Sequence, residues 1–94
     1  MTPITFKLDG ETYEADYDEL TSYRTSKQFA QSETNPGGMF EAMSRIFMGR
    51  DEEYIDAIGG DIASMGRLCD AAFKAAQAKN SSASPETSKA TGAK

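Results

Sequence analysis

Histidine and tryptophan are absent from this chain of 94 residues, and it contains a single cysteine, Cys69. Nucleophilic catalysis by serine, threonine or cysteine needs a neighbouring base, which is most often histidine. A lone cysteine cannot form an intrachain disulfide, and one placed among apolar residues behaves as an inert small hydrophobe. The composition therefore predicts a protein without catalytic residues.

Motifs for binding metal or phosphate are lacking as well. The acidic run from Asp51 to Glu53 fits the start of a helix, whereas a calcium loop would need alternating oxygen ligands and a closing glutamate. The Gly59-Gly60 pair is not followed by a lysine and does not follow a strand, so it does not fit a phosphate-binding loop. We expect neither a metal nor a cofactor.

Long apolar runs are also missing. No segment approaches the ~20 apolar residues that a membrane-spanning helix needs, and no apolar signal region follows Met1. Lysine and arginine number 10 against 15 acidic residues, which gives a formal charge of −5. A net negative charge opposes binding to a phosphate backbone. We therefore expect a cytoplasmic protein that binds neither membranes nor nucleic acid.

A crowded acidic segment is present near the N-terminus. Six acidic residues lie between positions 9 and 19 with no basic residue among them: Asp9, Glu11, Glu14, Asp16, Asp18 and Glu19. A run of like charges usually faces water, but it also suits a basic partner. Both interpretations remain open from the sequence alone.

The first sixteen residues have the pattern of a β-hairpin. Apolar and polar residues alternate on both sides of Asp9-Gly10, which is a favoured two-residue turn. Two strands alone are marginally stable, so their apolar face must lie on helices or extend another sheet. That predicted face consists of Ile4, Phe6, Leu8, Tyr13 and Ala15.

Helical periodicity predicts about four helices after the hairpin. They are a helix from Asp16 to about Ala30, one from Met39 to Met48, a short one capped by Asp51, and a long one opened by Asp61. Residues 31–38 have the composition of a loop. Gly49 and the Gly59-Gly60 pair are predicted to end the second and third helices.

The long helix has the clearest apolar stripe, opposite the polar residues Ser64 and Arg67. The stripe consists of Ile62, Met65, Leu68, Cys69, Ala72, Phe73 and Ala76. Gly66 lies at its edge and costs up to ~1 kcal/mol of helix stability against alanine. We therefore expect a neighbouring backbone to approach closely at Gly66.

Residues 80–94 contain no large apolar side chain, so nothing there can offset the entropy lost on ordering. We expect this tail to be disordered. Residues 1–79 are then one small domain of the α+β class. It is mainly helical, with a short N-terminal hairpin followed by about four helices.

Methionine and aromatic residues are concentrated in the predicted second and third helices. They fill a core by default, but two wide apolar faces exceed what a small domain easily covers. We therefore predict that part of this apolar surface contacts another protein. The candidate partner-binding residues are Met39, Phe40, Met43, Phe47, Met48, Tyr54 and Ile55.

The chain resembles the tail assembly chaperones of long-tailed bacteriophages and their prophage remnants. The resemblance is carried by FEAMSRIFMG at residues 40–49, EYIDAI at residues 53–58 and the helix from Asp61 to Ala76. The order of parts, from the N-terminal ITFKLDGETYEADYDEL to the polar tail, matches over nearly the whole chain.

This resemblance implies a non-catalytic helper in the host cell cytoplasm. Such a protein binds the tape-measure protein, keeps its apolar helices from aggregating and delivers it to the site where tail-tube protein polymerises. The resemblance also implies self-association and, through a ribosomal frameshift, a second and longer product. It transfers no catalytic residue to this chain.

An alternative function is an acidic inhibitor or DNA mimic that blocks a basic protein surface. In that case the acidic residues from Asp9 to Glu19 would imitate phosphates. Such binding would weaken steeply as salt shortens the Debye length below ~10 Å, whereas binding through apolar side chains would persist. The dependence on ionic strength therefore separates the two functions.

Overall fold

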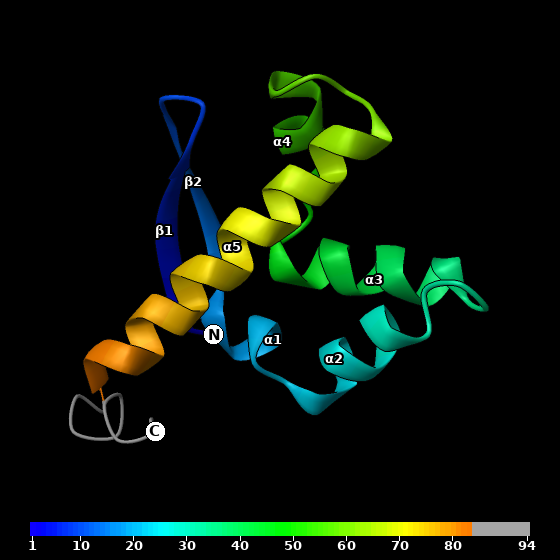
Figure 1. The fold of residues 1–94 in the computed structure, drawn as a ribbon, viewed down its shortest axis with the longest axis horizontal. Helices are drawn as coiled ribbons and strands as arrows, with labels where there is room; N and C mark the ends of the chain where they lie inside the picture. Colours follow the sequence, from blue (N-terminus) through cyan, green and yellow to red (C-terminus); the bar gives the residue numbers. More distant parts are fainter. Residues whose placement is uncertain (84–94) are drawn as a thin grey trace, which may run out of the picture.

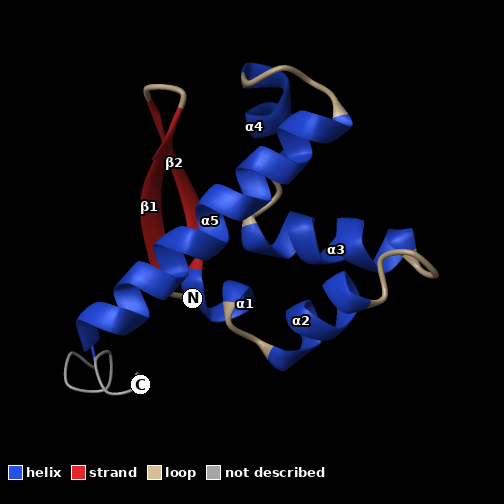
Figure 2. Cartoon of the chain, in the orientation of Figure 1, coloured by secondary structure: helices blue, strands red, loops and turns tan. Residues whose placement is uncertain are grey.

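The computed structural model describes residues 1–83 of the chain (Figures 1 and 2). Two strands are followed by five helices: β1 (Pro3–Leu8), β2 (Glu11–Asp16), α1 (Tyr17–Leu20), α2 (Tyr23–Ala30), α3 (Pro36–Ile46), α4 (Asp51–Ala57) and α5 (Ile62–Ala83). The α+β class, mainly helical, is confirmed. Residues 80–83 belong to α5, and the rest of the predicted disordered tail lies outside the described residues.

The hairpin forms where the alternation predicts it. β1 and β2 are antiparallel, with Phe6 opposite Tyr13. Asp9 and Gly10 both have positive φ angles, 54° and 83°, as a type I′ turn requires. Helix α5 runs diagonally across the molecule and packs against β1, so the apolar face of the hairpin is covered (Figure 1).

The prediction of one helix over residues 16–30 is wrong, because Thr21 and Ser22 are not helical and separate α1 from α2. Ser22 is extended, with φ −77° and ψ 150°, and its hydroxyl oxygen accepts the N–H of Thr25 at 3.1 Å. This bond satisfies a free N–H group at the start of α2. A local side-chain bond therefore replaces a continuous helix with α1 and α2, which run in different directions.

Two helix starts also differ from the prediction. Helix α3 begins at Pro36 and not at Met39, because the side chain of Asn35 accepts a backbone N–H at 3.3 Å and proline suits the first helical position. Helix α4 has Arg50 at its cap position, with no side-chain cap bond. Asp51 is therefore the first residue of α4, and the prediction that it is the cap is wrong.

The glycines follow the helices as predicted, although α3 ends at Ile46 and not at Met48. Gly49 has φ 81° and follows Met48, which has φ 55°, so two left-handed residues end α3. Gly59 and Gly60, with φ 143° and 75°, separate α4 from α5. These values lie in the region that favours glycine, which explains the residue type at each break.

Helix α5 begins beside Asp61, as predicted, because its carboxylate accepts the N–H of Ser64 at 2.9 Å. Ser64 is buried and not on the polar side, since its hydroxyl lies 3.1 Å from the carbonyl oxygen of Ile58. Ile62 was predicted to face inward but is 72% exposed. The prediction for Gly66 is wrong too, because a Cβ there would meet no atom within 4 Å.

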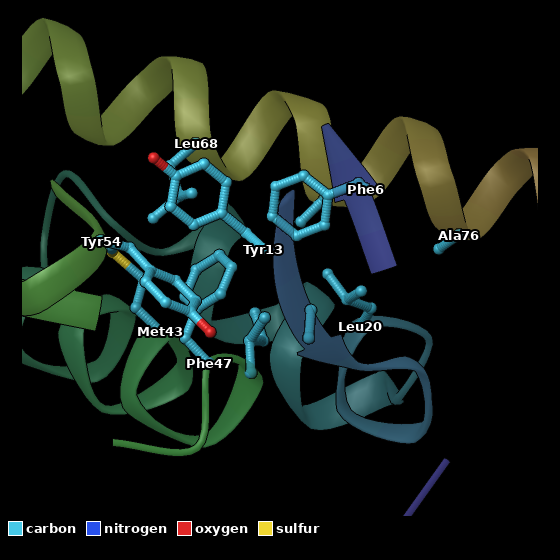
Figure 3. Close-up of a cluster of buried hydrophobic side chains, with 11 residues drawn as sticks. Phe6, Tyr13, Leu20, Met43, Phe47, Tyr54, Leu68 and Ala76 are labelled. Carbon is cyan, nitrogen blue, oxygen red and sulfur yellow. The ribbon is translucent and has the colours of Figure 1, made fainter. Parts of the chain in front are cut away.

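The core is built around four aromatic rings (Figure 3). Tyr13 meets Tyr54 nearly edge-on with ring centroids 4.8 Å apart, and Phe47 lies 5.9 Å from Tyr54 and 6.5 Å from Phe6. Such tilted contacts suit the quadrupoles of the rings. The other large buried side chains of this core are Leu20, Met43, Ile46 and Leu68.

Candidate interaction surface

The seven predicted partner-binding residues do not form one surface. Met43, Phe47 and Tyr54 are buried, Met39, Met48 and Ile55 are half-buried, and Phe40 is 48% exposed. All three are packed in the aromatic core, where Met43 and Phe47 cannot reach a partner in this conformation, whereas Tyr54 keeps 7% of its surface exposed on the wall of a groove. The assignment of Met43 and Phe47 to a partner surface is therefore corrected to a role in the fold, and the prediction stays open for the other five.

Helices α2 and α3 lie side by side (Figure 1). One side chain, that of Arg45, joins them to α1. The Nε atom of Arg45, on α3, donates to a carboxylate oxygen of Glu19 at 3.0 Å. The Nη2 atom of Arg45 donates to the side-chain oxygen of Gln28, on α2. Arg45 therefore fixes the position of α2 relative to α1.

A groove of about 210 Å³ opens between α1–α2 and the C-terminal half of α5. It is lined by Leu20, Thr21 and Ser26 on one side and by Phe73, Ala76 and Gln77 on the other. Leu20 and Ala76 are buried and form its floor. None of the six lining residues is charged, and we call this site the helix groove.

Aromatic side chains flank the helix groove. Tyr23 lies one helical turn before Ser26 on α2 and is 79% exposed. Phe29 lies one turn after Ser26, and its ring meets that of Phe73 edge-on with centroids 5.3 Å apart. The face of α2 beside the groove therefore carries apolar surface that the core does not cover.

The size of the helix groove limits what it can bind. Small-molecule sites usually measure about 300–1,000 Å³, whereas a cavity of about 150 Å³ already accepts a benzene ring. At about 210 Å³ the groove accommodates one aromatic or branched aliphatic side chain. Because no lining residue is charged, the groove fits an apolar side chain presented by another protein.

A second groove, of about 450 Å³, separates β2 from α4. Its lining includes Glu11, Thr12 and Tyr13 from β2, and Arg50, Glu53 and Tyr54 from α4 and the residue before it. The packed rings of Tyr13 and Tyr54 close its inner side. A hydrogen bond with Tyr54 and the nearby charge of Glu53 raise the pKa of Arg50. We call this site the strand groove.

Most of the acidic segment is engaged within the chain. Asp9 pairs with Arg67 and Glu19 with Arg45, Asp18 lies 3.5 Å from the N-terminal amino group, and Asp16 accepts the N–H of Asp18 at 3.0 Å. Glu11 and Glu14 make no ion pair or side-chain hydrogen bond with another described residue. The free negative charge of this segment is therefore concentrated on β2.

Reactive groups are few in the described part of the chain. Burial raises the pKa of the Cys69 thiol to about 11, and Asp51 adds to the shift, so the thiol is protonated at neutral pH. Within residues 1–83 no three His, Cys, Asp or Glu side chains gather as metal ligands would. No helix in that range has the length and apolar character needed to cross a bilayer.

The helix groove could not be predicted from a single helix over residues 16–30. On that helix Phe29 lies on the side opposite Leu20. The break at Ser22 reorients α2, so that Phe29 packs on Phe73 of α5. The available signal was Ser22 itself, because serine is a favoured residue immediately before a helix.

Comparisons of the chain with models of protein families, with curated protein sequences and with solved structures found no match in any of the three. A function has to follow from the chain's own residues. Its two distinctive surfaces are the uncharged helix groove and the acid-lined strand groove.

Proposed function

We propose that this chain is a non-catalytic tail assembly chaperone of a long-tailed bacteriophage or prophage. It binds apolar helices of the tape-measure protein and assists polymerisation of the tail-tube protein. The observation that supports this proposal most strongly is the uncharged helix groove beside the exposed ring of Tyr23. An open, uncharged groove lets a chaperone cover the apolar surface of a client until assembly.

A helical client suits the helix groove better than an extended one. Amphipathic helices bind in grooves through apolar residues spaced one helical turn apart. One client side chain enters between Leu20 and Phe73, and those one turn away reach Tyr23 on one side and Phe29 on the other. The uncharged lining accepts such a helix without burying an unpaired charge.

Further client contacts are assigned to α3 and α4. Phe40 is 48% exposed, and Met39, Met48 and Ile55 are half-buried, so each retains some accessible apolar surface. These four residues are the part of the predicted surface that is assigned to the client. The tail-tube protein and further copies of the chain are the other partners that the resemblance implies.

The alternative of an acidic inhibitor or DNA mimic has less support. A mimic needs a row of free acidic groups that can meet a basic groove. Four of the six acidic side chains between residues 9 and 19 are instead held by contacts within the chain, and Glu11 and Glu14 remain. Two free carboxylates on one strand are too few to imitate a phosphate backbone.

Co-expression tests the proposed function. The tape-measure protein, which is a long protein, is expressed with and without the chain, and its soluble fraction is measured after lysis. We expect the long protein to be soluble only with the chain, and the complex to survive a rise from about 0.15 M to about 1 M salt. Equal solubility without the chain, or loss of the complex in salt, contradicts the proposal.

A further inference from the structure

Strand β2 is paired with β1 on one side and open on the other. In a hairpin with a two-residue turn, the flanking residues Leu8 and Glu11 form a hydrogen-bonded pair, and such pairs alternate with non-bonded ones along the ladder. One step of register past the last strand pair, Pro3 and Asp16, this series reaches Thr2 and Tyr17. The N–H of Tyr17 donates to the carbonyl oxygen of Thr2 at 2.7 Å, which agrees with this alternation.

Thr12 and Glu14 lie between the hydrogen-bonded pairs, so their N–H and C=O groups point away from β1. Within residues 1–83 these backbone groups have no hydrogen-bond partner. The strand groove lies along this edge, because Glu11, Thr12 and Tyr13 of β2 line one side of it and residues of α4 line the other. Unpaired backbone groups beside an open groove are a template for a further strand.

The outer edge of β1 differs from that of β2. Pro3 and Lys7 are two of the β1 residues whose backbone groups point away from β2. Proline has no N–H to donate and lysine places a charge at the edge, and both residues are typical of strands that resist pairing. Strand β2 contains neither residue type, so the edge that borders the strand groove is the one open to a partner.

The charges around the strand groove select a basic partner. Glu11 and Glu53 line the groove and Glu14 lies on its strand, whereas Arg50 is the one basic residue in the lining. A second copy of β2 would bring the glutamates of both copies onto one ribbon, and like charges on facing strands destabilise a sheet. A second copy is therefore disfavoured, and a segment with lysine or arginine is favoured.

We propose that the strand groove binds an extended, basic segment of another protein, which adds to β2 as a third and antiparallel strand. Backbone bonds to Thr12 and Glu14 hold the segment, and its basic side chains lie on the same face as Glu14. Its alternate residues are apolar and face the rings of Tyr13 and Tyr54. This site is separate from the helix groove and does not depend on the client proposed for that groove.

An NMR titration of the full chain tests this proposal. The probe is a blocked hexapeptide of alternating valine and lysine, with a valine–glutamate peptide as its counterpart. We expect the lysine peptide to bind with a Kd on the order of 1 mM and to slow hydrogen exchange at the amides of Thr12 and Glu14. The glutamate peptide binds about tenfold more weakly, and Glu14→Lys reverses this preference.

Methylated peptides separate strand pairing from general attraction to the negative chain. In an antiparallel strand the lysine amides point at β2, so N-methylation of the lysines weakens binding about tenfold or more, and N-methylation of the valines leaves it unchanged. Glu33→Lys, in the exposed loop between α2 and α3, makes the same charge change away from the groove. Equal binding of both methylated peptides, or equal effects of Glu14→Lys and Glu33→Lys, overturns the proposal.

Discussion

Arg67, on α5, donates from Nη1 to both carboxylate oxygens of Asp9 at 3.0 Å, although the two residues are 58 positions apart in the sequence. Its Nη2 atom donates to the carbonyl oxygen of Ile58 at 2.9 Å. One side chain therefore joins the tip of the hairpin to the end of α4. The strand groove lies between these two elements, so Arg67 helps to set its width.

Loss of this contact should loosen the tip of the hairpin. The hydrogen bond to Asp9 raises the pKa of Arg67, but both side chains are exposed by nearly half. We expect Arg67→Ala to speed hydrogen exchange at Asp9 and Glu11 and to change the melting temperature little. Lys74→Ala breaks an exposed ion pair with Asp70 and is the control. Unchanged exchange at the tip in Arg67→Ala contradicts this role.

Arg45 and Arg24 both approach Glu19, but the structure predicts different effects of their removal. Arg45 is 25% exposed and bonds to Glu19 and Gln28, whereas Arg24 is 66% exposed and lies 3.9 Å from Glu19. Arg45→Ala should lower the free energy of unfolding by about 1–2 kcal/mol, and Arg24→Ala by less than about 0.5 kcal/mol. Urea denaturation measures both, and equal losses would show that Arg45 does not fix α2.

Two glycines should respond to alanine in opposite ways. A Cβ at Gly59 would collide with the hydroxyl oxygen of Ser64, and its φ of 143° strains any other residue. Gly59→Ala should therefore cost about 2 kcal/mol or more. Gly66 lies on α5 with open space around it, so Gly66→Ala should stabilise by up to about 1 kcal/mol. Thermal denaturation tests both variants. If Gly66→Ala lowers the melting temperature, a neighbouring backbone must lie close to Gly66, which would contradict the open space in the structure.

The thiol of Cys69 should make stability depend on pH in alkaline solution. Burial raises its pKa from 9.0 to about 11, so the folded chain retains a proton that the unfolded chain releases. Its contribution is complete below pH 9 and is lost as pH rises through 11. Between these values the wild type should lose about 2 kcal/mol more than Cys69→Ala. Identical pH profiles of the two chains in urea denaturation would rule out this contribution.

The sequence predicts those elements that are determined by a short segment with narrow conformational requirements. Alternation around Asp9-Gly10 predicts the hairpin, because a type I′ turn needs two residues that tolerate positive φ. The break at Ser22 and the start at Pro36 were not predicted, because side-chain bonds of Ser22 and Asn35 override the apolar period there. Whether a capping bond interrupts a helix or the helix continues depends on the tertiary packing of the segments on either side.

The candidate site was less predictable than the fold. A helical wheel gives the face on which Phe47 lies but not the element that covers it, and here the hairpin does so through Phe6. Phe40 is on the same helix and remains exposed. The helix groove brings Ser26 of α2 close to Phe73 of α5, 47 positions later in the sequence, and that proximity depends on tertiary packing which no local pattern contains.

The most direct test of the central claim is to fill the helix groove and measure solubility of the client. Ser26→Trp places a ring in the groove from an exposed position, and Ala63→Trp adds the same ring at the opposite end of α5. Circular dichroism first verifies that both variants fold. In co-expression, we predict that Ala63→Trp keeps the tape-measure protein soluble and that Ser26→Trp loses most of that soluble fraction. Equal solubility with the two variants would contradict the claim that the groove holds the client.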